Sequence, residues 1–160
     1  GTRPEYAKPD KLPYMPLLHF EFRPDYRWSN SRLHFVISAG GIGFGGGISQ
    51  FDAQGQRNRF RDAVMSERIL DELIEALEVA KRSGCYLENL NFRYIPKIYE
   101  LNERNEKLIK LKGLIVRSRT EADYEYLYSD QCVEKVVERF RSLLPLQKWI
   151  LENVCRSVAA

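Results

Sequence analysis

The sequence has no run of about 18 apolar residues, and its first residues lack the charged and then apolar pattern of a secretory signal. We therefore expect neither a membrane-spanning helix nor secretion. Cysteine is scarce, because Cys85, Cys132 and Cys155 are odd in number, widely spaced and never arranged as C-x-x-C. This spacing argues against a disulfide framework and a structural zinc, and predicts a reducing, cytoplasmic setting. The lack of a spanning segment predicts that no membrane is a partner.

Motifs of common cofactor sites and catalytic machinery are also missing. The chain contains no G-x-S-x-G and no HExxH, and it has only two histidines. Residues 41–46 resemble G-x-G-x-x-G loosely, but no Gly-Lys-Ser/Thr follows them. We therefore expect no cofactor and no bound metal, and we favour binding over catalysis.

The composition that is present suits one globular domain. The chain has 160 residues, of which 44% are hydrophobic and 29% are charged. Its net charge is only +3, yet 16 of the 25 basic residues are arginine. Arginine presents a rigid fork that matches phosphate and carboxylate, so an anionic partner is one explanation. Surface ion pairs with the 22 acidic residues are the other.

The first half of the chain predicts an antiparallel sheet built around a glycine-rich hairpin. Residues 32–49 alternate apolar positions on either side of Gly40-Gly41, which predicts two strands and a tight turn. Residues 17–22 alternate in the same way, and the apolar face is continuous when these three pairs lie opposite one another: Phe22 and Leu33, Phe20 and Phe35, Leu18 and Ile37. Across the hairpin the predicted neighbours are Ile37 with Phe44, Leu33 with Ile48, and Phe35 with Gly46.

The second half adds helices and further strands, and the whole predicts a single α+β domain. Its mostly antiparallel sheet would be packed by central and C-terminal helices. Ser66 marks an expected break in the central helical region, and Pro145 the expected start of the last helix. The predicted segments are an extended arm at 1–16, strands and the glycine hairpin at 17–49, helices at 54–83, strands at 87–119, and helices at 130–156. Within the second set of strands, the expected spans are 87–94 and 108–117.

Basic and aromatic side chains predict a binding surface for an anion. Three arginines, Arg57, Arg59 and Arg61, lie near the start of a predicted helix, where the helix dipole favours anions over cations. Interleaved arginines and aromatic residues are typical of surfaces that contact phosphates and stack bases. A plain solvated face is the alternative. The predicted ligand-binding residues are Lys11, Tyr14, Arg27, Trp28, Arg57, Arg61, Lys110 and Lys112.

A second group of polar residues lies on the other face of the predicted sheet. The strand register places His19, Glu21 and His34 together on this face. Two imidazoles and a carboxylate could transfer protons or hold a metal, but no further ligand has a supporting spacing. A solvated or helix-covered face is the alternative, so these three residues are weak catalytic candidates.

The order of short motifs resembles a known family. The motifs are Asp-Lys-Leu-Pro-Tyr at 10–14, the glycine hairpin at 40–47, Arg-Asp-Ala-Val at 61–64, Arg-Tyr-Ile-Pro at 93–96, Leu-Ile-Lys-Leu-Lys at 108–112, and Pro-Leu-Gln-Lys-Trp-Ile at 145–150. In this order they resemble the domain-of-unknown-function family 2461, conserved hypothetical proteins of bacteria and fungi. The family's N-terminal helical region is missing here, and Lys97-Ile98-Tyr99 stands where the family tends to have glycine after the proline. The resemblance implies a fold and no mechanism.

Three functions stay open at this point. The first is a non-catalytic module that binds an anionic ligand, with nucleic acid among the candidates. The second is a protein-interaction domain of a larger chain or complex, with a protein partner or a missing N-terminal region as its counterpart. The third is a hydrolase or acid–base enzyme that uses His34 and Glu21.

Overall fold

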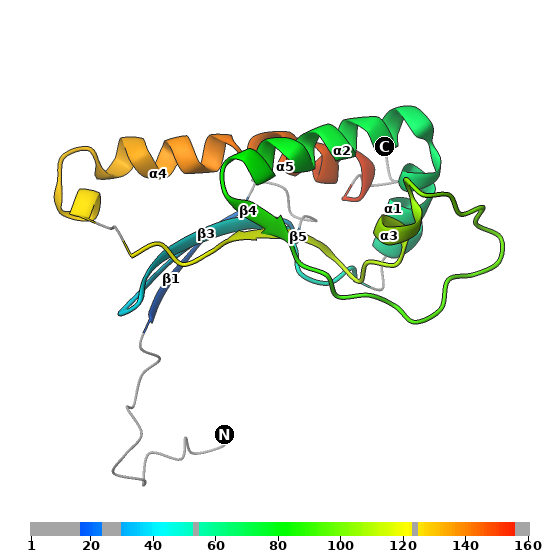
Figure 1. The fold of residues 1–160 in the computed structure, drawn as a ribbon, viewed down its shortest axis with the longest axis horizontal. Helices are drawn as coiled ribbons and strands as arrows, with labels where there is room; N and C mark the ends of the chain where they lie inside the picture. The colour runs from blue at the N-terminus through cyan, green and yellow to red at the C-terminus, as the bar shows by residue number, and fades with distance from the viewer. Residues whose placement is uncertain (1–16, 24–29, 53–54, 123–124, 156–160) are drawn as a thin grey trace, which may run out of the picture.

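The computed structural model describes residues 17–23, 30–52, 55–122 and 125–155, and over these residues it is an α+β domain. Five antiparallel strands form one sheet in the order β1-β2-β3-β5-β4. Figure 1 shows α2, α4 and α5 stacked above one face of this sheet, with α1 and α3 at one end. The predicted fold class is confirmed. The strands are β1 (Leu17–Phe22), β2 (Arg32–Ser38), β3 (Gly41–Ile48), β4 (Cys85–Leu87) and β5 (Leu114–Ser118). The helices are α1 (Gln56–Met65), α2 (Glu67–Arg82), α3 (Glu106–Ile109), the 3-10 helix η1 (Glu125–Tyr128), α4 (Cys132–Arg141) and α5 (Leu144–Asn153).

The predicted register between the first two strands is confirmed. β1 and β2 are antiparallel, and Phe20 lies opposite Phe35 while Glu21 lies opposite His34. The rings of Phe22 and Phe140 meet at a centroid distance of 5.2 Å, which shows that this apolar face of the strands points toward α4. The opposite face therefore points away from the helices.

The predicted register of the glycine hairpin is wrong by two residues. Phe35 faces Phe44 rather than glycine, Ile37 faces Ile42, and Leu33 faces Gly46. The turn consists of residues 39–40, because Gly41 already belongs to β3 and lies opposite Ser38. Gly41 has a φ of 131°, and the backbone of Glu121 occupies the place where a Cβ would stand. A side chain is therefore excluded at Gly41, and this close approach sets the start of the strand.

Two predicted strands have other bounds than expected. β4 spans Cys85–Leu87, so only Leu87 of the strand predicted at 87–94 belongs to it, and the segment predicted as a strand at 108–117 begins instead with α3 and becomes β5 only at Leu114. The apolar residues Leu108 and Ile109 lie in the single turn of α3, and Ile109 is fully buried. Alternation over a few residues does not distinguish these two conformations. The arm expected at 1–16 lies outside the described residues.

The helical predictions are confirmed more closely. Ser66 separates α1 from α2, and α2 ends just before Ser83 and Gly84. Pro145 lies in the first turn of α5, where it interrupts no helical hydrogen bond. The core between helices and sheet includes Phe60 and Trp149, whose rings meet at 6.1 Å. Within the described part of the chain, no helix is long and apolar enough to cross a membrane.

Candidate anion-binding site

Three cations surround one aromatic ring beside α1. The guanidinium carbon of Arg57 lies 4.4 Å from the centroid of the Phe92 ring, and that of Arg61 lies 5.4 Å from it. The Lys112 Nζ lies 5.5 Å from the same centroid, and Arg61 also lies 5.9 Å from the Tyr99 ring. These five residues are called the arginine–aromatic site. Cations attract the faces of aromatic rings, but they repel one another.

A short ladder outside the main sheet holds Phe92 in place. Its backbone N–H donates to the Lys110 carbonyl at 2.7 Å, and the Lys112 N–H donates to the Leu90 carbonyl at 2.8 Å. Between these two hydrogen bonds, Asn91 pairs with Leu111, which is almost fully buried. The ladder therefore fixes Phe92 and Lys112 to the core.

A buried polar network fixes the start of α1. The Gln56 amide exchanges two hydrogen bonds with the Asn30 amide, at 2.7 and 3.1 Å. One turn of helix later, the Arg59 Nε donates to the Val154 carbonyl at 2.7 Å, which ties α1 to the end of α5. Arg57 and Arg61 lie four residues apart on this anchored helix, so both reach the same ring.

The two arginines of the site differ from the other arginines that lie below the surface. Among the described residues, four other arginines are half-buried, and each has an oxygen partner: Arg32 contacts Glu21, Arg59 the Val154 carbonyl, Arg117 Glu88, and Arg139 Glu121. Arg57 and Arg61 have no carboxylate or carbonyl partner within the described chain.

The Nε of Arg57 and the Nε of Arg61 are both buried without an acceptor. The Nε of Arg32 also lacks an acceptor, but another nitrogen of that guanidinium contacts Glu21. The Nε of Arg117 lies 2.5 Å from a carboxylate oxygen of Glu88. Arg61 is only 6% exposed. Buried donors and charges are ordinarily paired, so this site leaves donors for a ligand.

The electrostatics of Arg61 agree with this geometry. Burial lowers the pKa of its guanidinium from the usual value, Tyr99 opposes this shift, and the charge of Arg57 adds to it. A guanidinium still keeps its proton at neutral pH. The site is therefore a cluster of three positive charges, and an anion would relieve their repulsion.

The structure brings together three of the predicted binding residues: Arg57, Arg61 and Lys112. Lys110 contributes its backbone carbonyl to Phe92, while its side chain pairs with Glu106 at 3.2 Å. The other four predicted ligand-binding residues, Lys11, Tyr14, Arg27 and Trp28, lie outside the described residues.

Sequence reasoning missed the two aromatic members, Phe92 and Tyr99. A signal was available, because basic and aromatic residues interleave from residue 92 to residue 99. The alternation at 87–94 instead predicts a strand that includes Phe92 and ends before Tyr99.

The three weak catalytic candidates do meet on the sheet face that points away from the helices. The imidazole rings of His19 and His34 stand edge to face at a centroid distance of 5.7 Å. The Glu21 carboxylate accepts hydrogen bonds from one Arg32 nitrogen at 2.9 and 3.0 Å, and from Arg23 at 3.3 Å. No hydrogen bond joins Glu21 to His34 in the described structure.

The protonation of these groups does not favour acid–base chemistry. Burial, together with the charges of Arg117 and His19, lowers the pKa of His34 to about 4 against the opposing effect of Glu21. For Glu21, desolvation is the largest single effect and raises the pKa, but the hydrogen bonds and charges of Arg23 and Arg32 together outweigh it and lower the pKa. A neutral imidazole beside an ion-paired carboxylate is a poor match for a base that works near neutral pH.

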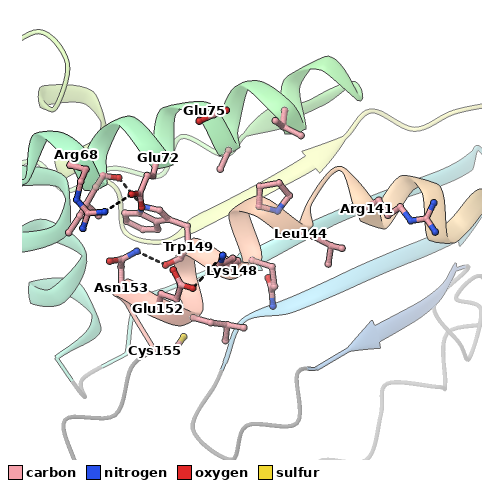
Figure 2. Close-up of a pocket in the computed structure, with 16 residues that line it drawn as sticks. Arg68, Glu72, Glu75, Arg141, Leu144, Lys148, Trp149, Glu152, Asn153 and Cys155 are labelled. Carbon is pink, nitrogen blue, oxygen red and sulfur yellow. Dashed lines mark hydrogen bonds and ion pairs between the residues drawn. The ribbon is translucent and has the colours of Figure 1, made fainter.

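An open groove of about 1590 Å³ lies between α2 and α5, away from both residue groups. Figure 2 shows its rim ion pairs, Arg68 with Glu72 at 2.8 Å and Lys148 with Glu152 at 3.9 Å. The Trp149 indole forms part of its wall and donates to the Ile69 carbonyl. The groove shares no residue with the arginine–aromatic site.

Comparison with known proteins gives a family and no function. The family model described as conserved hypothetical protein (DUF2461) matches residues 7–149, which is most of the chain. No curated protein and no solved structure matches. Among the described residues, no group of three or more His, Cys, Asp or Glu side chains could hold a metal ion.

Proposed function

The chain belongs to the DUF2461 family of conserved hypothetical proteins, and we propose that it is a non-catalytic module that binds an anionic ligand at the arginine–aromatic site. The observation that supports this proposal is the contrast in charge pairing. Arg57 and Arg61 face one ring without an oxygen partner in the described chain, while each of the other half-buried arginines has one. A phosphate group would supply the missing acceptors, because its oxygens match the fork of a guanidinium.

The ligand class is tested with two soluble anions, tripolyphosphate and a short single-stranded oligonucleotide. If three cations contact the backbone of a single strand, log K falls with log salt with a slope of about two. The affinity for the oligonucleotide would then fall about twentyfold between about 50 and 200 mM salt. Titration calorimetry or fluorescence anisotropy measures both ligands.

The double variant Arg57→Gln/Arg61→Gln removes two of the three charges, and we expect binding of both anions to fall at least tenfold. The matched control is Arg68→Gln/Arg82→Gln, which lowers the net charge equally from exposed positions on α2. Equal losses in both variants would show that net charge and not this site is responsible. That result would contradict the proposal, as would a wild-type protein that binds neither anion.

Protein interaction is the second candidate function, and the groove between α2 and α5 favours it. Leu144 and Trp149 both line this groove, and Leu144 is half exposed while Trp149 is buried. Exposed apolar side chains around a recess are typical of interaction surfaces. A second copy of the chain is the first partner to test. Light scattering would show an oligomer that Leu144→Lys dissociates; a wild-type monomer at high concentration would count against a second copy.

A further inference from the structure

The connection between β4 and α3 exposes four large apolar side chains. It covers residues 88–105 and runs in a wide arc beside α1 and α3 (Figure 1). Leu90 is 58% exposed, Tyr94 77%, Ile98 84% and Leu101 42%. Long irregular connections in a compact domain are uncommon and are often functional. Four apolar side chains turned to solvent need a physical reason, because burial elsewhere would be favourable.

The same connection is positively charged where its apolar side chains are most exposed. Residues 89–99 contain Arg93 and Lys97 and no aspartate or glutamate. The segment also supplies Phe92 and Tyr99 to the arginine–aromatic site, so the exposed side chains lie on the chain that carries that site. This stretch and the arginine–aromatic site together supply five cations: Arg57, Arg61, Arg93, Lys97 and Lys112. The acidic residues of the connection lie at its two ends, where Glu88 pairs with Arg117 and Glu100 and Glu103 follow Tyr99.

We propose that this surface, residues 88–105 with the arginine–aromatic site, docks on an anionic lipid bilayer. The lipid phosphate would take the place of the anion between Arg57, Arg61 and Lys112, while Tyr94 and Ile98 enter the interfacial region. The inference rests on the proposed function, because it uses the same anion site. It departs from the expectation that no membrane is involved. That expectation followed from the lack of a spanning segment, and docking at the surface requires none.

The chemistry of the exposed side chains favours lipid over nucleic acid. Leu90, Ile98 and Leu101 are aliphatic and offer no ring on which a base could stack. The Phe92 ring already has the Arg57 guanidinium over its face at 4.4 Å. Tyrosine and aliphatic side chains flanked by lysine and arginine are typical of segments that lie in a membrane interface. Electrostatic attraction and apolar burial therefore act together on one surface.

The test is sedimentation of the whole chain with two kinds of vesicle, phosphatidylcholine alone and phosphatidylcholine with about one third phosphatidylserine. We expect binding to the anionic vesicles only. Each cation near such a surface strengthens binding about fivefold, so Arg57→Gln/Arg61→Gln is expected to weaken binding about 25-fold. Higher salt should weaken it in the same direction.

The apolar part is tested separately with Tyr94→Ser/Ile98→Ser. We expect about a tenfold loss of vesicle binding or more, with unchanged binding of tripolyphosphate. The matched control is Tyr128→Ser/Val133→Ser, which removes a tyrosine and a β-branched residue at positions that are 84% and 73% exposed on η1 and α4. The control should bind vesicles within about twofold of wild type.

The outcomes separate the two proposals. If wild type binds tripolyphosphate and ignores anionic vesicles, the bilayer inference is overturned and the anion-binding function stands. Oligonucleotide binding that Tyr94→Ser/Ile98→Ser abolishes, without any vesicle binding, would overturn it in favour of nucleic acid. Binding to neither anion nor vesicle would remove both proposals. Equal loss in the apolar variant and its control would also overturn the inference.

Discussion

Two charged regions of this domain differ in whether their arginines have carboxylate partners. On the sheet face that points away from the helices, each arginine near His34 contacts a carboxylate: Arg32 contacts Glu21, and Arg117 contacts Glu88. At the arginine–aromatic site, Arg57 and Arg61 share one ring and have no such partner in the described chain. The first region looks richer in chemistry because it contains both histidines. The second has the electrostatic imbalance that a ligand would correct.

The presence of histidines and the pairing of charges therefore rank these two regions differently. Compensated charges stabilise a fold or cost little, while uncompensated charges below the surface destabilise it. A domain keeps such charges when they serve another purpose, and binding is the simplest purpose. The comparison predicts opposite responses to mutation in the two regions.

The largest effect is expected at Gly45, in the centre of the sheet. A Cβ there would lie 2.6 Å from the His34 Nε2 and would overlap the Val116 carbonyl. Because neither the strand nor the buried ring can move freely, Gly45→Ala should lower the free energy of unfolding by about 3 kcal/mol. Urea denaturation measures this. The control is Gly40→Ala in the turn, where the nearest atom is 3.9 Å away; equal losses would contradict the packing described here.

The next effect concerns His34 and pH. Its pKa is about 4 in the fold, below the usual 6.5, so the unfolded chain binds the proton first as pH falls. The contribution of neutral His34 to stability is therefore complete above pH 6.5 and is lost progressively as pH falls toward 4. We expect His34→Gln to reduce the loss of stability between pH 7 and pH 4.5 by about 2 kcal/mol.

Urea titrations at the two pH values measure this difference, with His19→Gln as the control. His19 faces the same ring from β1, and the charged groups around His34 are otherwise Arg117 and Glu21. His19→Gln should keep most of the pH dependence. If both substitutions change it equally, burial of His34 is not its cause.

Alternation predicts which residues of the strands share a face. It limits β1 on β2 to registers that keep Phe20 and Phe35 on one face, because a slip of one residue would place them on opposite faces. A slip of two keeps every face, so the same pattern could not fix the hairpin. The contact that decides it, Glu121 against Gly41, joins residues 80 positions apart.

The candidate site, like the fold, could be predicted from the sequence only in part. The unfavourable position of Arg57 and Arg61 near a helix start was visible in the sequence, and both residues belong to the site. Phe92 was not identified, because its role depends on a ladder with Lys110 and Lys112 that replaces the predicted strands. The lack of a carboxylate partner is a fact of three-dimensional packing, and no sequence pattern states it.

The third prediction tests whether the unpaired charge of Arg61 lowers the stability of the fold while a paired arginine raises it. Arg61→Met keeps an apolar stem of similar length and removes a buried charge without a partner, so we expect the free energy of unfolding to rise by about 1 kcal/mol. Loss of the contact with the Phe92 ring offsets part of this gain. Arg139→Met is the control, because Arg139 also lies over an aromatic ring, that of Phe44, but is paired with Glu121 at 2.8 Å.

Arg139→Met should lower stability by about 1 kcal/mol, since it leaves the Glu121 carboxylate without its partner. Urea denaturation of the two variants measures whether the free energy of unfolding rises or falls in each. A loss of stability in Arg61→Met as large as that in Arg139→Met would mean that Arg61 is compensated in the free protein. The contrast between the two regions would then disappear.

The smallest effect is expected for the most visible ion pair, that between Arg32 and Glu21 on the exposed side of the sheet. Its geometry is good, with two contacts at 2.9 and 3.0 Å, yet both side chains are partly solvated. A double-mutant cycle with Arg32→Gln and Glu21→Gln should give a coupling free energy of about 0.5 kcal/mol that shrinks in high salt. A coupling of several kcal/mol, insensitive to salt, would show that solvent is excluded from this face. In that case Glu21 and His34 would share a low-dielectric environment, and the acid–base hypothesis would regain a physical basis.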